Sequence, residues 1–352
     1  MITQDDLRAA VGAGLLTEAQ AASLLTLATD RQTGRARAQG LDEPFELFRG
    51  FNEVFIVVGL GILGGGWIGI WQLAIFASGD FRTTTLMAGG LTALVLALLS
   101  EYFVRRRRMV APALALTIGW AVNAVVFWLT LMDAYSVLGG VEWAGSVIPA
   151  GLTTLTIGAF WARYRVPFAM ALMAVGAFAF LILALGTVAG DVRGWQDLFL
   201  LSASGPFAWG TLLFGIVLFA IAMWFDMSDP HRLSLRSANG FWLHVAAAPA
   251  IVNTLALTLI DDGSPVALAI LAVVLCALAL IAVIIDRRSF LISAVGYIVA
   301  LVALVTEGEG TPSLVLLLGA GLVGLGAGWQ WVRARLLRPV PQLIRNGLPP
   351  SA

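Results

Sequence analysis

Short charged connections of alternating sign separate the long apolar stretches of this chain, and this alternation constrains the fold more than any other feature. Connections that carry arginine alternate with connections that carry aspartate or glutamate. In chain order they hold Arg105–Arg108, Asp133 with Glu142, Arg163 with Arg165, Asp191 with Asp197, Arg232 with Arg236, Asp261 with Asp262, Arg287 with Arg288, Glu307 with Glu309, and Arg333 with Arg335 and Arg338. Because arginine beside a membrane span stays on the cytoplasmic side, the alternation predicts a bilayer crossing at each apolar stretch.

The composition excludes an ordinary soluble globule. Hydrophobic residues make up 59% of the chain and charged residues 12%, whereas about a quarter of the residues are charged in a typical soluble domain. All 21 basic residues are arginine, and the formal net charge is zero. In the predicted topology every arginine except Arg82 and Arg193 lies inside, so the charge reports orientation and gives no reason to expect a nucleic acid partner.

A helix needs roughly 20 apolar residues to cross about 30 Å of hydrocarbon, and about ten segments meet this requirement. They cover residues 53–78, 84–104, 109–132, 143–161, 167–189, 205–225, 239–260, 265–285, 289–306 and 312–332. We therefore expect an all-α fold, a polytopic transmembrane helical bundle of about ten spans over residues 51–335, with both the N-terminus and the C-terminus cytoplasmic. Residues 336–352 are expected to form a cytoplasmic tail.

Two details refine this topology. The segment from Trp195 to Trp224 is too long for one untilted span and contains Gly205 and Pro206. We expect a short helix in the outer interface after Trp195, and a span that begins at Pro206, where the missing amide hydrogen costs no hydrogen bond. The two stretches 53–190 and 196–333 are of nearly equal length, which leaves an inverted repeat of two five-helix halves open.

Residues 1–50 have the features of a cytoplasmic helical hairpin with an interfacial lead-in to the first span. Thr3 with Asp6, and Thr17 with Gln20, have the spacing of an N-cap and its capping partner. The start of the chain lacks a basic segment and a cleavage site, so no cleaved signal peptide is expected. Since a hairpin of this size cannot bury its own core, we expect it to dock on the membrane domain or on a protein partner.

Glycine recurs every four residues in the first predicted span, at Gly61, Gly65 and Gly69. Small residues at this spacing allow helix backbones to approach closely in lipid. The pattern fits close packing inside one bundle, and it also fits the face of a homodimer.

Ionisable residues at hydrocarbon depth are costly and tend to mark an ion or substrate path, and the predicted spans contain almost none. Glu101 is the nearest case, but it lies four residues before Arg105, where a helical ion pair is expected. Glu53 begins the first span, where the helix dipole favours a carboxylate. No nucleotide, hydrolase or metal motif appears, and Cys276 lies within an apolar run, so we expect no cofactor, no metal and no catalytic residue.

His244 is the most informative polar residue of the predicted spans, because histidine can carry a proton near neutral pH. It precedes Pro249 and Asn253 in the seventh span, and with Asn123 and Glu101 it forms a candidate polar path. His244 and Asn253 lie about 180° apart on a straight helix, so a shared path requires a kink at Pro249. The alternative is that each polar group bonds to a nearby backbone oxygen.

Several stretches of the chain resemble a bacterial family of polytopic inner-membrane proteins that is defined only as a domain of unknown function. The resemblance rests on AGLLTEAQAASL and FRGFNEVFIVVGLGIL in the first part, and on RSANGFWLHVAAAPAIVNTL, IDRRSFLISAVGYI and GAGWQWVRARLLRPVPQL in the second. It implies a multi-pass fold in the inner membrane of a Gram-negative bacterium. It implies no functional residue.

These observations predict a non-enzymatic structural or assembly partner, in which the N-terminal hairpin and the basic connections recruit another protein. A transporter or flippase for an uncharged or lipid-like solute is the alternative, because such cargo does not require buried carboxylates. A continuous polar cavity that reaches Asn123 or Asn253 would favour transport. A solid core would favour the partner role.

Overall fold

The computed structural model describes most of the predicted membrane domain. The described residues are 7, 10–11, 13–17, 20, 24, 51–136, 140–141, 143–190, 192, 194–203, 205–230, 232, 234–287, 316, 319–321, 323–324, 327–345 and 348. All structural statements below concern these residues.

Eight helices in the described part of the chain are long and apolar enough to span a bilayer. They are α3 (Phe51–Ser78), α4 (Phe81–Ser100) with its π-helical extension η1 (Glu101–Arg106), α5 (Val110–Leu131), α6 (Trp143–Tyr164), α7 (Ala169–Ala189), α9 (Phe207–Met227), α10 (Leu235–Asp262) and α11 (Pro265–Ile285). The chain is thus a helical protein with the character of a membrane protein, and the first eight predicted spans are confirmed as helices. The ninth predicted span, and most of the tenth, lie outside the described residues.

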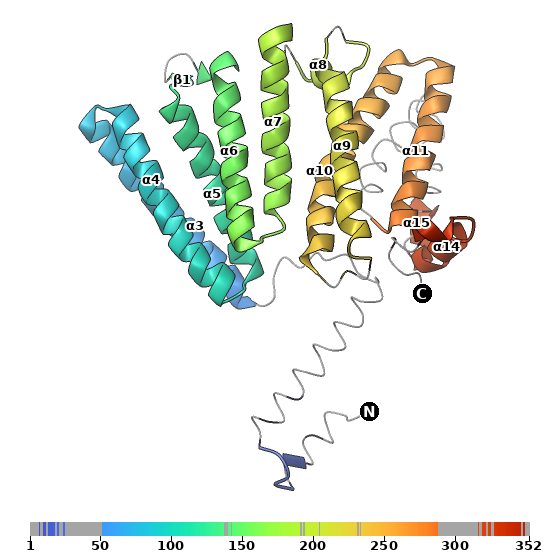
Figure 1. Cartoon of the computed structure of the whole chain (residues 1–352), viewed down its shortest axis with the longest axis horizontal. Coiled ribbons are helices and arrows are strands. Elements are labelled where there is room, and N and C mark those ends of the chain that lie inside the picture. Colours follow the sequence, from blue (N-terminus) through green and yellow to red (C-terminus); the bar gives the residue numbers. More distant parts are fainter. Residues whose placement is uncertain are drawn as a thin grey trace.

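The spanning helices stand side by side in a row, from α3 and α4 at one edge to α11 at the other (Figure 1). The connections between them fall at two ends. We call one of these the basic end: it is formed by η1, the connections at residues 164–169 and 227–235, and α14 (Trp329–Leu336). The opposite end carries the short antiparallel pair of β1 (Tyr135–Ser136) and β2 (Gly140–Val141), together with α8 (Trp195–Phe199).

The elements outside the spans agree with two local predictions. Helix α8 is the short helix expected after Trp195, and α9 begins at Phe207 with Pro206 as its N-cap. In the N-terminal segment, the Thr17 amide donates to Gln20 Oε1 at 2.9 Å and the Gln20 amide donates to Thr17 Oγ1 at 3.3 Å, which confirms that capping pair. The other predicted pair, at residues 3 and 6, lies outside the described residues.

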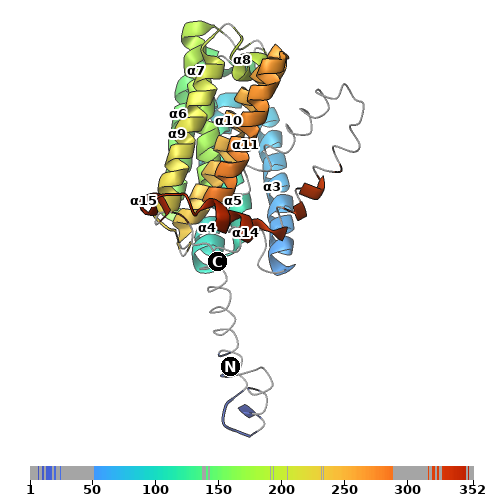
Figure 2. The same ribbon diagram turned by 90° about the vertical axis from the view of Figure 1, so that its right-hand side faces the viewer.

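The C-terminal segment packs on the basic end. Helices α14 and α15 (Gln342–Arg345) lie across the direction of the spans (Figure 2). Leu337 and Leu348 are buried against Ile285, the last residue of α11, together with Phe219 and Met223 of α9. The segment after the last predicted span is therefore part of the folded bundle.

The regularly spaced glycines of α3 do not pack closely against another helix within the described residues. No atom lies within 4 Å of the position that a Cβ would occupy on Gly61, Gly65 or Gly69. A homodimer through this face stays a prediction.

Glu53 links α3 to α5. Its side chain is buried, and its two carboxylate oxygens accept from the backbone amides of Val110 at 3.3 Å and Ala111 at 2.9 Å. Helix α5 has no side-chain cap of its own at Met109. The carboxylate therefore satisfies two of the four amides that a helix N-terminus leaves without an intrahelical partner, and it complements the helix dipole.

Replacement of Glu53 by leucine is expected to lower the free energy of unfolding by about 1 kcal/mol, the usual value of a helix cap. Titration of the purified protein from mild detergent into sodium dodecyl sulfate measures this change. Asn52→Leu is the matched control, because Asn52 is exposed on the same turn. Equal effects of the two substitutions would contradict the capping role.

Candidate functional site

Three ionisable side chains, from α9, from α10 and from the residues just after α11, meet at the basic end. Asp226 lies in the last turn of α9, His244 lies in the third turn of α10, and Arg287 follows α11 by two residues. His244 and Arg287 are 0% exposed and Asp226 is 5% exposed. Burial of a charge without a partner is very costly. The site is therefore stable only if these groups lie close enough to form ion pairs and hydrogen bonds with one another.

Asp226 is the centre of this group. Arg287 donates to it twice, from Nε to Oδ2 at 3.0 Å and from Nη2 to Oδ1 at 2.5 Å, in a bidentate pair. His244 Nε2 lies 2.9 Å from Oδ2, and because an ionised carboxylate can only accept, the imidazole donates this bond. Arg287 Nη2 also reaches Ser237 of α10, at 2.9 Å from its carbonyl oxygen and 3.0 Å from its hydroxyl. The contacts join α9, α10 and the end of α11.

A second buried pair lies next to the first along the chain. Asp286 ends α11 in the left-handed conformation, with φ 58°. Arg232 donates from Nη2 to the Asp286 carbonyl oxygen at 2.7 Å, and its Nη1 lies 3.2 Å from Oδ2. The Trp329 indole of α14 donates to Asp286 Oδ1 at 2.6 Å. Asp286 at the end of α11 therefore contacts two other segments. Through Arg232 it contacts the connection between α9 and α10, and through Trp329 it contacts α14. Together we call Asp226, Arg232, His244, Asp286 and Arg287 the charge cluster.

A glycine makes room for the centre of the charge cluster. A Cβ on Gly240 of α10 would lie 2.3 Å from Asp226 Oδ1 and 3.2 Å from the carbonyl oxygen of Ala222. Only glycine therefore lets α9 and α10 approach this closely. Small and branched apolar residues surround the contact: Leu218, Ala222, Leu243, Ala247, Ala248 and Ile251. The ring of Phe219 packs edge-on to His244, with 5.4 Å between the ring centroids.

The burial of Asp226, Asp286 and Arg287 at the ends of α9 and α11 was not predicted. The prediction that the spans hold almost no ionisable residue at hydrocarbon depth stays a prediction. The predicted sixth span ended at residue 225 and the predicted eighth at residue 285, so Asp226, Asp286 and Arg287 fell in connections. Helix α9 continues to Met227, and α10 and α14 cover the carboxyl end of α11. Signals for this site were present in the sequence, since His244, Asp226 and Arg287 each stand beside an apolar run, but no local pattern relates residues so far apart in the chain.

The other predicted site residues lie elsewhere in the bundle. Asn123 of α5 donates from Nδ2 to the Gly89 carbonyl oxygen of α4 at 3.1 Å. Glu101 forms the expected ion pair with Arg105 and a second one with Arg163 of α6, at 3.1 Å. Both residues belong to the half of the row formed by α4, α5 and α6 (Figure 1). His244 bonds across to α9, so the structure does not join these three residues into one path.

Asn253 is half-buried on α10, which continues as one helix through Pro249. The predicted alternative for His244, a bond to a nearby backbone oxygen, is replaced by the bond to Asp226 on the neighbouring helix. A role for Asn253 in a path stays a prediction.

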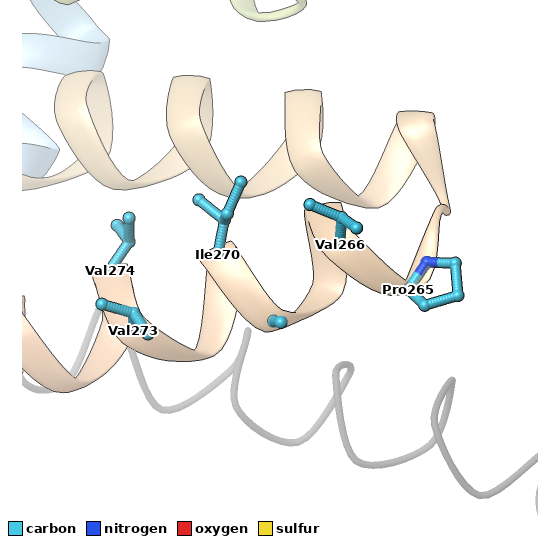
Figure 3. Close-up of a pocket in the computed structure, with 6 residues that line it drawn as sticks. Pro265, Val266, Ile270, Val273 and Val274 are labelled. Carbon is cyan, nitrogen blue, oxygen red and sulfur yellow. The ribbon is translucent and has the colours of Figure 1, made fainter.

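An apolar groove of about 450 Å³ lies on α11, near its N-terminal end (Figure 3). Its walls are all apolar: Pro265, Val266, Ala269, Ile270, Val273 and Val274. Its described walls suit acyl chains or apolar side chains and offer no hydrogen bond to a polar solute. It is therefore not the polar cavity at Asn123 or Asn253 that transport would require.

The described residues contain no group of three or more His, Cys, Asp and Glu side chains that could hold a metal ion. The contacts within the charge cluster support charge pairing, and a proton could be exchanged between His244 and Asp226. No protein-family model, no curated protein and no solved structure matches this chain.

Proposed function

We propose that this chain is a non-enzymatic, multi-pass protein of the bacterial inner membrane that serves as a structural or assembly partner for another protein. The observation that carries the proposal is the charge cluster. Its buried polar groups bind helices to one another and to α14, and this arrangement favours a fixed surface at the basic end.

The energetics of the basic end support a static role. A transporter that opened between α9, α10 and α11 at this end would have to separate Asp226 from Arg287 and Asp286 from Arg232. Removal of one partner by mutation typically costs about 3–5 kcal/mol, because a charge is left buried without its partner, and separation of the two charges inside the bundle would leave both in that state. A bundle that holds two such pairs at one end is suited to keeping its shape.

Polar groups in the other half of the bundle are used in the same way. Glu53 caps α5, and Asn123 joins α5 to α4. The indoles of Trp120 and Trp128 donate to the carbonyl oxygen and the hydroxyl of Thr156 on α6, at 3.1 Å and 2.9 Å. These bonds connect neighbouring helices, which supports a framework more than a conduit.

The N-terminal segment is the candidate for partner recruitment. Leu15 and Leu24 are 77% and 45% exposed in a segment that the positive-inside rule assigns to the cytoplasm. We infer that a protein partner covers these leucines.

Transport or lipid flipping is the second candidate, favoured by the buried ionisable groups. Ionisable residues inside a helical bundle commonly mark ion or substrate paths, and His244 with Asp226 could exchange a proton. This candidate predicts activity of the isolated protein, whereas the partner role does not.

Photocrosslinking in living cells tests the proposal. A photoreactive amino acid at Leu15, Leu24 or Arg165 is expected to give one discrete adduct with a second protein, and deletion of this chain should lower the membrane level of that protein. The same probe at Asp133 or Asp262, exposed at the opposite end, is the matched control. No adduct at the first three positions, combined with accelerated flipping of fluorescent lipids by the protein in liposomes, would overturn the partner role in favour of transport.

A further inference from the structure

We propose that α14 is an interfacial helix whose exposed side binds the headgroups of anionic phospholipids, with Arg335 and Arg338 as the cationic contacts and Trp331 as the interfacial anchor. This inference is independent of the partner role proposed above. It rests on the position of α14, on the division of its side chains between two sides, and on the charges at the basic end.

Helix α14 lies across the direction of the spans, beside the end of α11 (Figure 2). Trp329, Arg333 and Leu337 recur every four residues and are 4%, 0% and 3% exposed, so this side faces the bundle. The Trp329 indole fixes the helix by its bond to Asp286. The helix is thus held parallel to the expected membrane plane by its buried side.

The opposite side of α14 presents an arginine on an aromatic ring. Trp331 is 65% exposed, and Arg335, one turn later, is exposed as well. The guanidinium carbon of Arg335 lies 5.0 Å from the centroid of the Trp331 ring, a cation–π contact. Arg338, beyond the end of the helix, is also exposed. An exposed tryptophan at the end of a span is typical of the headgroup region.

The arginines of this side have no acidic partner among the described residues, and the carboxylates there are already engaged. Among the described residues, arginine side chains, backbone amides or the Ser234 hydroxyl occupy each of them: Glu53, Glu101, Asp226, Asp229 and Asp286. Among the described residues, no carboxylate therefore competes with an external anion for Arg335 and Arg338. A phosphate group matches the planar fork of a guanidinium.

Phospholipid is the anion source that fits this position. Polybasic segments immediately beside membrane spans are attracted to anionic leaflets, and the membrane domain places α14 at such a leaflet whenever the chain is in a bilayer. A helix with a buried side, an exposed tryptophan and exposed arginines is the usual form of an interfacial helix. A soluble acidic protein would not require Trp331 at the headgroup level.

Native mass spectrometry of the full-length protein in detergent, titrated with phosphatidylglycerol or phosphatidylcholine, tests the proposal. We expect the wild type to bind phosphatidylglycerol more tightly than phosphatidylcholine. The double variant Arg335→Gln/Arg338→Gln is expected to lose about 25-fold in affinity for the first phosphatidylglycerol molecule, since one arginine at an anionic surface contributes about fivefold. Its affinity for phosphatidylcholine should not change.

Two controls separate this site from a general effect of charge. Arg106→Gln/Arg107→Gln removes two exposed arginines of the basic end, the last residue of η1 and its C-cap, and it should leave the first binding event unchanged. Arg335→Lys/Arg338→Lys keeps the charge but lacks the planar fork, so its affinity should lie between that of the wild type and that of the glutamine variant. Equal loss in the η1 variant, equal binding of the two lipids by the wild type, or binding of an acidic peptide with no lipid preference would each overturn the assignment to α14.

Discussion

Replacement of Arg287 by methionine is expected to destabilise the bundle by about 3–5 kcal/mol, the usual effect of removing one partner from a buried ion pair. The substitution keeps most of the side-chain volume but leaves the Asp226 carboxylate buried without its bidentate partner. It also removes the two bonds to Ser237. The free energy of unfolding in sodium dodecyl sulfate titrations measures the loss.

A double variant and a control at an exposed ion pair test whether the loss of stability comes from the buried charge of Asp226. Asp226→Asn combined with Arg287→Met removes both charges, so most of the stability should return and the two substitutions should be strongly non-additive. Arg105→Met is the matched control, because its ion pair with Glu101 is 47% and 39% exposed. Exposed pairs contribute about 0–1 kcal/mol. Similar losses for Arg287→Met and Arg105→Met would show that the charge cluster has no special role.

The spans could be predicted from the sequence because each depends on a local property. An apolar run of sufficient length specifies a helix in lipid, since every backbone polar group must be satisfied within the segment. Pro206 set the start of α9, and the spacing of Thr17 and Gln20 gave their capping bonds. The ion pair of Glu101 with Arg105 was predictable for the same reason, because its partners are one helical turn apart.

Contacts between distant segments were not predictable in this way. Glu53 and the amides of α5 are more than fifty residues apart, as are Asp226 and Arg287. A charged residue at the end of an apolar run is assigned to a connection when hydropathy alone is used. Whether a neighbouring helix buries that residue depends on the packing of the helices. At the basic end α10 and α14 cover such residues, and a buried site results.

The two halves of the row differ in how their helices are held together. In the half formed by α3, α4, α5 and α6, the helices are joined by neutral or carboxylate–amide bonds, as at Glu53 and Asn123, and by the exposed ion pair of Glu101 with Arg163. Buried ion pairs join α9 to α11, as at Asp226 and Asp286. We therefore expect substitutions of polar residues to have much larger effects on stability between α9 and α14 than between α3 and α6.

Gly240→Ala should test the close contact of α9 and α10 on which the charge cluster depends. A Cβ at this position would meet Asp226 Oδ1 at 2.3 Å and the backbone oxygen of Ala222 at 3.2 Å. Asp226 cannot move aside without losing its bonds to Arg287 and His244, so the helices must separate. We expect a loss of about 3 kcal/mol in the free energy of unfolding, at the upper end of the usual cost of overpacking.

Gly61→Ala is the matched control for this substitution, because a Cβ on Gly61 meets no atom within 4 Å. It should leave stability unchanged or raise it by up to about 1 kcal/mol, since alanine favours a helix over glycine. If the contact with the carboxylate is the cause, Gly240→Ala should cost much less in an Asp226→Ala background than in the wild type. An equal cost in both backgrounds would assign the effect to the Ala222 backbone alone and would separate the closeness of α9 and α10 from the charge cluster.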